Sequence, residues 1–320
     1  MSLPVNVVTA ADESYRPQAE VLVRSLALTQ QELTHLTVLG SGWTSNQVSR
    51  LAKAGLGRVD VEVVALTDPR AAQIPTLRHG FPPAATYSVL AAELAEFDGE
   101  HRIVYLDADT VVRHPLREIA MRDMASPVAA VVDAHVALVG MPSMWRPWRE
   151  EGVDPMAPYL NTGVMVIDVE HWRAEGLTDR VFGLLSKYQL PCVDQDALNL
   201  VLAGGFDRLD PRWNLMPYHL MTLLRTSDLV EENNRLDEAI SDPAIIHYHR
   251  SFLGKPWQIG CTHPGRDLWR NLASDLGCYR RSISFRDLVR NLGARAVGMS
   301  SLDERASSLA TMSWPDNLAG

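Results

Sequence analysis

The sequence of 320 residues is poor in cysteine and has no excess of basic residues. Its three cysteines, Cys192, Cys261 and Cys278, form an odd and widely spaced set without the spacing of zinc ligands or of a redox pair. We interpret them as packing residues of a reducing compartment. Lys and Arg number 30 against 39 Asp and Glu, which gives a net charge of −9. Because neutralising phosphates requires the opposite excess, no nucleic-acid partner is expected.

Long hydrophobic runs are also missing. The longest apolar stretch, Pro127–Met141, is interrupted by Asp133 and His135 and is too short to span a bilayer. The first residues, Met1–Ala10, enter an apolar segment without the basic region and long apolar core of a signal peptide. We therefore expect a cytoplasmic protein without a transmembrane segment.

The sequence does contain a large apolar fraction, 46% of the chain, in an alternating arrangement. Short β-branched runs alternate with longer amphipathic stretches, which is typical of parallel strands joined by helices. The predicted strands are Val5–Thr9, Leu36–Gly40, Val59–Leu66, Arg102–Leu106 and Val128–Val132, and the predicted helices are Pro17–Thr29, Thr44–Ala54 and Ala84–Phe97. The pattern predicts an α/β fold with a Rossmann-like, mostly parallel central sheet and flanking helices. Ligands of such sheets bind beyond the carboxyl ends of the strands.

The second half of the chain is less regular. Further strands are predicted at Leu160–Val169 and Ala244–Tyr248, and further helices at Leu177–Tyr188, Asp194–Ala203 and Asp267–Leu276. The Pro- and Trp-rich segment Met141–Pro158 is interpreted as a long surface loop and a candidate lid. After Pro264 the chain becomes helical and locally basic. We therefore divide it into a main domain, residues 1–264, and a C-terminal extension, residues 265–320.

The segment Ile103–Thr110 is an apolar strand that ends in two carboxylates, Asp107 and Asp109, on either side of the small residue Ala108. The small side chain lets the turn approach a ligand closely. Two carboxylates suit Mg²⁺ or Mn²⁺ that bridges phosphates. Because aspartates are common where strands leave a sheet, the tripeptide alone does not establish a metal site.

The same Asp-x-Asp-x-Thr pattern is typical of haloacid-dehalogenase-type phosphatases, in which the first aspartate is a nucleophile toward phosphate. That class expects the motif after the first strand, with a lysine and an acidic pair downstream. Here about a hundred residues of α/β sequence precede the motif, and no adjacent Asp-Asp pair is present. The phosphatase is kept as the lesser alternative.

Three further regions place polar side chains at strand or helix ends. Asn161–Val164 lies at the mouth of a buried strand, and Pro191–Asn199 opens a helix with acids and an amide. A helix N-terminus favours such groups. Ile245–His249 ends a strand in imidazoles and leads to Gly254–Trp257. Imidazole can complete a metal shell, and a lysine beside it can contact a phosphate.

In this order, the motifs resemble those of family 8 of the retaining glycosyltransferases, the group that includes glycogenin and bacterial lipopolysaccharide galactosyltransferases. The matches are Ala-Ala-Asp-x-x-Tyr at Ala10–Tyr15, Asp-x-Asp at Asp107–Asp109, Asn-Thr-Gly-Val at Asn161–Val164, Asp-Gln-Asp at Asp194–Asp196 and His…Lys-Pro-Trp at His247–Trp257. Five matches in family order could hardly arise by chance. The resemblance implies a GT-A-type nucleotide-diphospho-sugar transferase fold and a retaining hexosyltransferase.

The resemblance also implies a metal site and a donor site. Asp107, Asp109 and His247 would bind Mn²⁺, or alternatively Mg²⁺, together with the diphosphate of a UDP-sugar. Asp12 would accept a hydrogen bond from the uracil ring, with Tyr15 stacked near it. The full set of donor contacts implied is Ala10, Asp12, Tyr15, Asp107, Ala108, Asp109, Asp133, Asn161, Thr162 and Lys255, the last of these on the diphosphate.

Asp194 and Gln195 are the catalytic residues that the resemblance implies, beneath the donor sugar and opposite the leaving group. Asp133 would lie near the acceptor or donor sugar, and Asn161 would orient sugar hydroxyls. Retention can arise by same-face attack or by double displacement through a protein nucleophile. Since an amide is a poor nucleophile, we favour same-face attack, with Gln195 and Asp194 stabilising positive charge on the sugar.

Two positions depart from the family pattern. A basic residue commonly follows the Thr-Tyr pair near the donor, but here Thr86-Tyr87-Ser88 is followed by Val89. The family interval to the lysine matches His249 to Lys255, whereas His247 is eight residues from Lys255. We prefer His247 as the metal ligand because Ile245-Ile246 places it at the strand end, as the family pattern does. Val89 raises the alternative of a nucleotide-sugar-binding protein without transfer activity.

The acceptor is left open by the sequence: a saccharide, a lipid-linked glycan and a small molecule all fit, since acceptor loops vary freely on such scaffolds. The extension carries Arg280, Arg281, Arg286, Arg290 and Arg295 in a short span. This basic segment could contact an anionic membrane surface peripherally. We prefer a solvated helix packed on the main domain.

Overall fold

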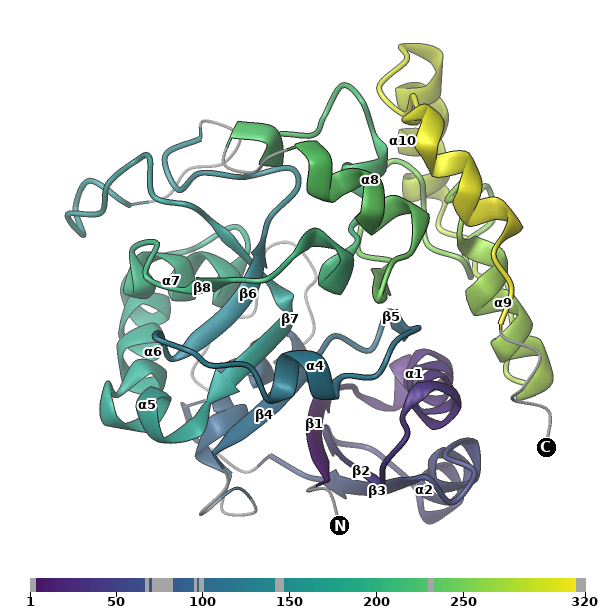
Figure 1. Cartoon of the computed structure of the whole chain (residues 1–320), viewed down its shortest axis with the longest axis horizontal. Coiled ribbons are helices and arrows are strands. Elements are labelled where there is room, and N and C mark those ends of the chain that lie inside the picture. Colours follow the sequence, from purple (N-terminus) through teal and green to yellow (C-terminus); the bar gives the residue numbers. More distant parts are fainter. Residues whose placement is uncertain are drawn as a thin grey trace.

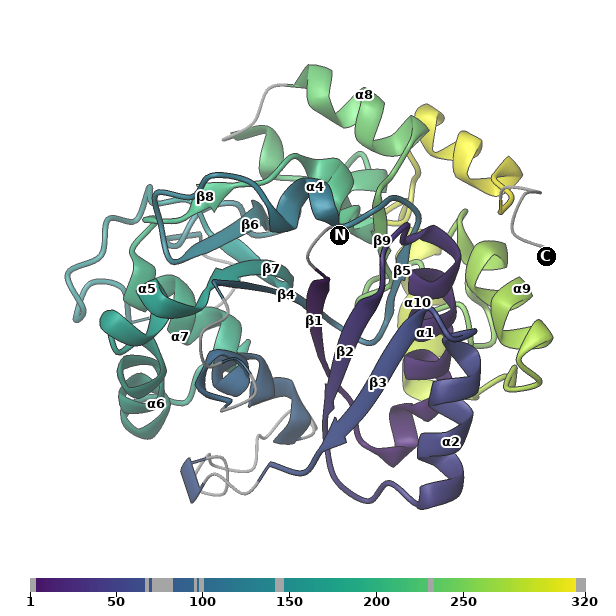
Figure 2. The ribbon, with the colours of Figure 1, turned by 60° about the horizontal axis from the view of Figure 1, so that its bottom comes forward.

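A seven-stranded sheet runs through the centre of the computed structural model, with the strand order β3-β2-β1-β4-β7-β6-β8 (Figures 1 and 2). The structure describes residues 4–66, 69–70, 83–94, 97, 101–141, 147–229 and 233–314. The strands of this sheet are β1 (Val5–Ala10), β2 (Thr34–Leu39), β3 (Val59–Val64), β4 (Arg102–Leu106), β6 (Val128–Val132), β7 (Leu160–Asp168) and β8 (Asp207–Arg208). β7 is antiparallel to both of its neighbours, and the other pairings in the sheet are parallel.

Helices bury both faces of the sheet because side chains along each strand alternate between the two faces. Val7 of β1 belongs to one hydrophobic cluster, while its neighbour Val8 belongs to another. The helices beside these clusters are α1 (Arg16–Thr29), α2 (Ser45–Ala54) and α4 (Arg117–Ala120) for the first, and α5 (Val169–Ala174), α6 (Leu177–Lys187) and α7 (Val193–Leu202) for the second. Figure 2 shows α1 and α2 beside β2 and β3, with α5, α6 and α7 gathered beyond β4 and β7.

Most strand and helix predictions are confirmed to within a few residues. β4 and β6 have the predicted bounds, and α2 begins after Thr44, whose side chain caps Gln47 N in a reciprocal capping box. The helix predicted over Ala84–Phe97 is wrong in type, because Pro83–Glu93 forms a 3₁₀ helix, and residues 95–96 lie outside the described part. The consecutive residues Val89–Ala92 are all buried. Four consecutive buried residues do not fit a surface α-helix, which buries only one face.

The predicted lid, Met141–Pro158, lies only partly within the described residues, since 142–146 fall outside them. Its later part packs on the protein, with Val153 and Ala157 buried in the core and Leu138 bridging to Pro158. A role as a lid therefore stays a prediction.

A second sheet of two strands was not predicted in full. β5 (Thr110–Val112) directly follows the Asp107–Asp109 turn and pairs antiparallel with β9 (Ile245–His247). In this register Thr110 lies opposite His247. The sequence indicated β9 but gave no sign of β5, which is too short to show an alternating pattern. This pairing brings the second half of the chain to the end of β4.

The C-terminal part contains the helices α8 (Asn233–Ser241), α9 (Arg266–Asp275) and α10 (Phe285–Ala296). Trp269 and Leu272 of α9 share a hydrophobic cluster with Val21 of α1. The division of the chain after residue 264 stays a prediction, because this cluster contains residues from both sides of it. α10 exposes the apolar side chains of Phe285, Val289 and Leu292. The preferred interpretation of this segment as a solvated helix stays a prediction, and contact with a membrane surface stays the alternative.

Among the described residues, no helix combines the length and the apolar character needed to cross a membrane.

We predict that Glu20 of α1 is the main electrostatic contribution to stability on this side of the sheet. Its buried carboxylate accepts from Arg16 at 2.5 Å and from Arg50 of α2 at 2.9 Å. Glu20→Ala should lower the free energy of unfolding by roughly 2–4 kcal/mol, since it leaves two arginines without their partner. Urea unfolding at pH 7 measures the loss. Asp60→Ala, which removes an exposed pair with His35, is the control and should change stability by less than about 0.5 kcal/mol.

The pH dependence gives a second readout of the same substitution. Burial raises the pKa of Glu20, but the hydrogen bonds from Arg50 and Arg16 outweigh burial and hold it below the usual 4.5. A lowered folded-state pKa contributes stability above pH 4.5 that is lost as the pH falls. The difference between wild type and Glu20→Ala should therefore shrink below that pH. A difference that does not change with pH would contradict this assignment.

Candidate active site

A cavity of about 660 Å³ opens where β1 and β4 end. These strands are parallel neighbours in the middle of the sheet, so the segments that follow them leave the sheet at the same edge. All predicted site residues except Lys255 line this cavity: Ala10, Asp12, Tyr15, Asp107, Ala108, Asp109, Asp133, Asn161, Thr162, Asp194, Gln195 and His247. Lys255 contacts the lining residue Asp109. The structure therefore brings together residues that are spread over most of the chain.

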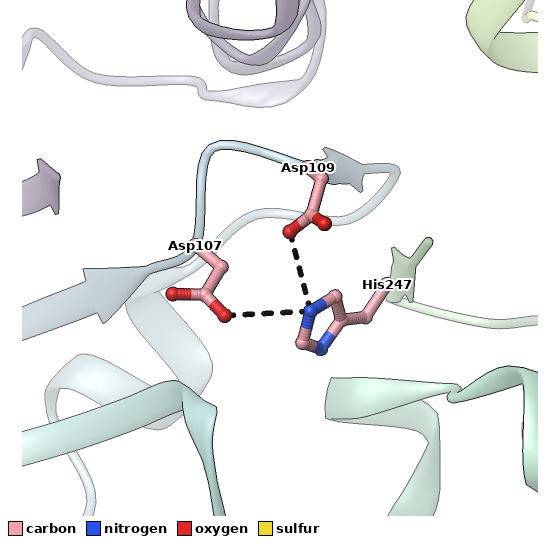
Figure 3. A group of neighbouring side chains, drawn as sticks. All are labelled: Asp107, Asp109 and His247. Atoms are coloured by element: carbon pink, nitrogen blue, oxygen red, sulfur yellow. Dashed lines mark ion pairs between the residues drawn. The ribbon is translucent and has the colours of Figure 1, made fainter. Parts of the chain in front are cut away.

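Asp107, Asp109 and His247 converge on one point of the cavity (Figure 3). His247 Nε2 lies 3.4 Å from Asp107 Oδ2 and 3.3 Å from Asp109 Oδ1. One ligand atom of each residue lies within 4.8 Å of the others. His247 and Asp109 are buried, whereas the Asp107 side chain is 39% exposed. This group, which we call the metal triad, thus has one side that is open to the cavity.

Local backbone geometry explains this convergence. Thr110 closes the turn after β4, since its amide and its hydroxyl both donate to the Asp107 carbonyl, at 3.1 and 2.8 Å. The β5–β9 pairing then sets His247 against the turn. Gly163 of β7 lies directly beneath, where an added Cβ would be 2.1 Å from His247 Cε1 and 2.8 Å from Asp107 Oδ2. Only glycine leaves room for both side chains at this position.

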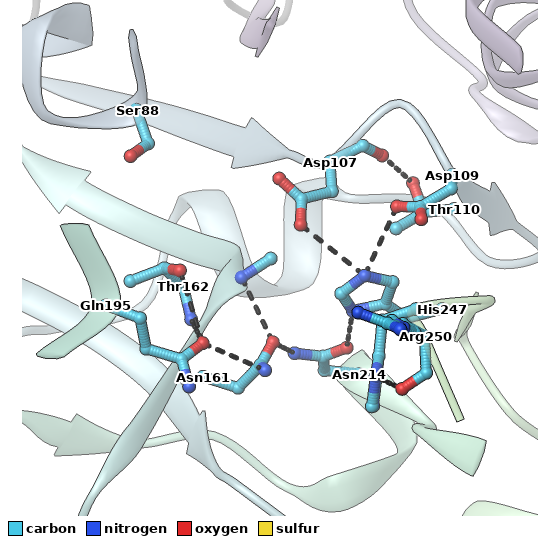
Figure 4. Close-up of polar contacts among 12 residues, drawn as sticks. Ser88, Asp107, Asp109, Thr110, Asn161, Thr162, Gln195, Asn214, His247 and Arg250 are labelled. Atoms are coloured by element: carbon cyan, nitrogen blue, oxygen red, sulfur yellow. Dashed lines mark hydrogen bonds and ion pairs between the residues drawn. The ribbon is translucent and has the colours of Figure 1, made fainter. Parts of the chain in front are cut away.

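Asn214 fixes which nitrogen of His247 faces the carboxylates (Figure 4). His247 Nδ1 lies 3.0 Å from Asn214 Oδ1, and the Asn214 amide nitrogen donates to Asn161 Oδ1 at 2.9 Å. Because the amide oxygen must accept, Nδ1 carries a proton, and Nε2 is the nitrogen that faces the two aspartates and would offer its lone pair to a bound cation. Buried Nε2 makes no aligned hydrogen bond among the described residues.

This arrangement fits a divalent cation. Two carboxylates and an imidazole nitrogen are suitable ligands for Mn²⁺ or Mg²⁺, and an outer partner such as Asn214 is typical of metal-binding histidines. Burial lowers the pKa of His247, but the two carboxylates outweigh burial and raise it to about 9. The two carboxylates therefore create a negative potential that stabilises a positive charge at this point.

Lys255 supplies part of that charge from the other side of Asp109. Its ammonium donates to Asp109 Oδ2 at 2.5 Å and to the Tyr15 hydroxyl at 2.8 Å. Burial opposes ionisation of Asp109, but Lys255 and His247 outweigh it and hold the pKa of this carboxyl well below its usual range. Two of the three donors of Lys255 are thus used within the protein, and one is left for a ligand.

A network of amides lies on the other side of His247. Asn161 Nδ2 donates to Asp133 Oδ2 at 2.9 Å and to Gln195 Oε1 at 3.2 Å. The Gln195 oxygen also accepts from the Thr162 amide at 3.2 Å, and Asp133 Oδ1 accepts from the His135 amide at 2.9 Å. The network runs without a break from Asp133 through Asn161 and Asn214 to His247. Hydrogen bonds therefore connect the predicted sugar-site residues to the proposed metal ligand His247.

Asp194 is buried beside this network and accepts from the Ser88 hydroxyl at 2.7 Å. Burial raises the pKa of Asp194 to about 7, with the Ser88 hydrogen bond opposing the rise and Asp107 adding to it. The resulting carboxyl group titrates near neutral pH. Perturbed carboxyl groups of this kind are concentrated at functional sites.

The remaining predicted residues are placed as follows. Asp12 Oδ1 caps the turn that follows β1, accepting from the Ser14 amide at 2.9 Å and the Tyr15 amide at 3.2 Å, and the residue also lines the cavity. His249 is not part of the group formed by Asp107, Asp109 and His247, and its Nδ1 lies 3.1 Å from the carbonyl oxygen of Arg250. The geometry thus joins His247, rather than His249, to the two aspartates.

Sequence reasoning missed several residues of the candidate site. Asn214 had no signal, because it lies in a 3₁₀ segment, Pro211–Asn214, without a recognisable motif. Tyr105 was seen only as a strand residue, yet its hydroxyl donates to Asp107 Oδ1 at 3.1 Å. Arg286 and Arg290 were assigned to an appended tail but line the cavity. The only signal in the sequence was the group of arginines in this segment, which did not indicate that two of them face the cavity.

Val89, the main departure from the family pattern, lies in the hydrophobic core and is 1% exposed. Its carbonyl accepts from Thr178, and it is not among the cavity-lining residues. A basic residue at this position would place a charge in the core. Val89 therefore says nothing about whether the cavity is functional.

Comparison with known proteins agrees with this arrangement. A model of the family described as Glycosyl transferase family 8 matches residues 6–260. General stress protein A of Bacillus subtilis is 29% identical over 275 residues, which cover 82% of this chain and 91% of that protein. The lipopolysaccharide 1,2-glucosyltransferase of Escherichia coli is 28% identical over 53% of this chain and 48% of its own length.

Solved structures show the same fold. The galactosyltransferase LgtC in complex with donor and acceptor sugar analogs has a TM-score of 0.65 at 21% identity, covering 89% of this chain and 100% of LgtC. The bifunctional glycosyltransferase WbbM has a TM-score of 0.68 at 18% identity, covering 88% of this chain and 52% of WbbM. The expected GT-A-type fold is thus confirmed. With a family match over most of its length, the chain belongs to glycosyl transferase family 8.

Proposed function

We propose that the protein transfers a hexose from a UDP-sugar to an acceptor hydroxyl with retention at the anomeric carbon, with Mn²⁺, or alternatively Mg²⁺, bound at Asp107, Asp109 and His247. One observation carries this proposal: His247 Nε2 is directed at two carboxylates and has no aligned hydrogen-bond partner among the described residues. A cation bound there would draw negative charge from the departing diphosphate. Such Lewis-acid assistance needs no proton donor from the protein.

The protein's own groups would bind the rest of the donor. The Lys255 ammonium is hydrogen-bonded to Asp109, a proposed metal ligand, so its remaining donor would contact a diphosphate held at the metal triad. Tyr15 and Asp12 lie on the same side of the cavity, at the end of β1, where a uracil ring would be accommodated. Asn161 and Asp133 would orient sugar hydroxyls from the amide network.

Same-face attack is the mechanism we favour for the sugar transfer. The Gln195 amide oxygen would face the positive charge that develops on the sugar, and three contacts to Asn161 and Thr162 hold it in place. Preorganised dipoles of this kind are a large source of rate enhancement. Asp194 would add negative potential from behind Gln195 in its ionised form.

The phosphatase alternative lacks support, because the Asp-x-Asp turn follows β4 rather than the first strand, and the family match belongs to glycosyltransferases. The alternative of a binding protein without transfer activity rested on Val89, which lies in the core. No observation on the described residues favours either.

We predict that Asp109→Asn abolishes Mn²⁺-dependent binding of UDP. The substitution keeps the size of the side chain but removes the charge of a proposed metal ligand. The affinity for UDP in the presence of Mn²⁺ should fall by more than about 100-fold, since even outer partners of metal ligands contribute 10- to 100-fold. Isothermal titration calorimetry with Mn²⁺ and with EDTA measures the effect. Asp123→Ala, at an exposed aspartate outside the cavity, is the matched control, and an unchanged metal dependence in Asp109→Asn would remove the assignment.

Gln195→Ala is expected to slow transfer much more than it weakens donor binding. Loss of a preorganised dipole should reduce kcat by about 100-fold, while the dissociation constant for the UDP-sugar changes only a few-fold. Metal-dependent hydrolysis of a panel of radiolabelled UDP-sugars measures kcat, and equilibrium binding measures affinity. Equal losses in both quantities would assign Gln195 to ground-state binding instead.

Asp194→Asn should stabilise the protein at high pH and have no effect at low pH. The folded-state pKa of about 7 lies above the ordinary 3.8, so the folded protein binds the extra proton between these values. The contribution of Asp194 to the stability of the wild type therefore falls as the pH rises from 4 to 7. At pH 8 in EDTA, Asp194→Asn should be more stable by on the order of 2–4 kcal/mol. Urea unfolding at pH 4 and pH 8 measures the difference, and a pH-independent value would count against the buried charge.

A further inference from the structure

Three arginines line the same cavity as the metal triad but come from the C-terminal part of the chain. Arg250 follows β9, and Arg286 and Arg290 lie on successive turns of α10. Helical residues four positions apart lie on one face, so both α10 arginines face the cavity together. We call Arg250, Arg286 and Arg290 the arginine cluster. Part of the basic extension is therefore a wall of the site.

The positive charge of the arginine cluster is only partly neutralised by nearby carboxylates. Asp287 Oδ1 lies 3.2 Å from Arg290 Nη1 and 3.7 Å from Arg250 Nη2. Within the described ranges, Arg286 forms no ion pair with a carboxylate. Three guanidinium groups thus share one carboxylate. The surplus positive charge faces a cavity in which an anion could neutralise it.

Arg290 is held in place rather than free in solvent. Its Nη2 donates to the Ser251 carbonyl at 2.9 Å, and the guanidinium lies 5.8 Å from the centroid of the Phe252 ring. Burial lowers the pKa of Arg290, Asp287 opposes this, and repulsion from Arg250 and Arg286 lowers it further. The mutual repulsion is what a bound phosphate or carboxylate would relieve. Guanidinium groups are suited to both, since their forked donors match two oxygens.

A series of ring contacts extends from the proposed metal ligand His247 along the lining of the cavity. The His247 and His249 ring centroids are 5.0 Å apart, and Tyr218 stacks on His249 at 5.6 Å. Tyr218 also stacks on His135, with ring centroids 4.3 Å apart. Asp133, Arg290 and Arg250 all act electrostatically on Tyr218, so its ring lies near both the sugar-site carboxylate and the arginine cluster.

We propose that the arginine cluster is an anion subsite for the acceptor, so that the acceptor carries a phosphate or carboxylate group. This inference rests on the proposed function, because it assigns the donor diphosphate to the metal triad and Lys255. Lys255 directs its ammonium at Asp109 and Tyr15, whereas Arg250 and Arg290 of the arginine cluster pair with Asp287 of α10. An acceptor that enters beside Tyr218 would thus meet positive charge at one end and the sugar site at the other.

The test begins with the donor site, so that the two proposals can fail separately. UDP is titrated with Mn²⁺ into the full-length wild type and into Arg286→Gln. Arg286→Gln should bind UDP within about twofold of the wild type, because the cluster does not contact the diphosphate. Absence of Mn²⁺-dependent UDP binding in the wild type would refute the proposed function before any acceptor probe is added. A loss of UDP affinity in Arg286→Gln would overturn the acceptor assignment in favour of the donor.

Glycerol 3-phosphate and glycerol are then titrated into the UDP–Mn²⁺ complex. The wild type should prefer the phosphate probe, and Arg286→Gln should weaken its binding by about tenfold, the loss expected for one charge-assisted hydrogen bond. The double variant Arg250→Gln/Arg286→Gln should weaken it further. Arg295→Gln, an exposed arginine at the far end of the same helix, is the matched control and should bind as the wild type does.

The anion could belong to a soluble molecule or to a lipid headgroup, and vesicles distinguish these sources. Co-sedimentation with phosphatidylglycerol vesicles is compared with phosphatidylcholine vesicles for the same variants. Glycerol 3-phosphate binding that depends on Arg286 supports a soluble acceptor. Vesicle binding that is lost in Arg286→Gln and kept in Arg295→Gln supports a lipid-linked one. No preference for either anionic probe, or a preference that Arg286→Gln leaves unchanged, overturns the subsite.

Discussion

The pairing of β5 with β9 is the contact on which the candidate site depends. β4 alone ends in a turn that carries two aspartates, and only the register of Thr110 opposite His247 adds a nitrogen ligand to them. Gly163 of β7 leaves the space that this approach needs, and Asn214 sets the tautomer of the ring. Three segments that are far apart in the sequence thus depend on one short antiparallel contact.

Charge is distributed unevenly around the cavity, and this unevenness gives its regions different chemistry. Asp107 and Asp109 gather negative charge, which raises the pKa of His247 and pairs with the Lys255 ammonium, so that end favours a cation. The arginine cluster gathers positive charge at the C-terminal wall. Because the cavity is lined by protein of low polarisability, each group acts more strongly there than it would in water. A donor held through its diphosphate and an anionic acceptor would therefore be directed to different ends.

The sequence predicted the fold and twelve of the residues that line the cavity because each predicted segment has a local signal. Arg102–Leu106 is a buried β-branched strand with bounds visible in the sequence, and the motif residues follow such strands directly. Asn214 and Arg286 could not be found in this way, since their importance comes from contacts with residues more than fifty positions distant or from the packing of a helix against the cavity. The prediction of an α-helix over Ala84–Phe97 was wrong for a related reason. Core packing, rather than helix propensity, determines that Pro83–Glu93 forms a 3₁₀ helix.

The surroundings of Asp194 and Gln195 bear on how the sugar would be transferred. A nucleophile in a double displacement needs an ionised, accessible oxygen. Asp194 is buried, is engaged by Ser88 and has a pKa of about 7, raised by burial, so half of the carboxyl groups are protonated at that pH. The oxygen of Gln195 already accepts from Asn161 and Thr162. Both groups are held as fixed dipoles or charges rather than presented as nucleophiles, and this arrangement favours same-face attack with electrostatic support from beneath the sugar.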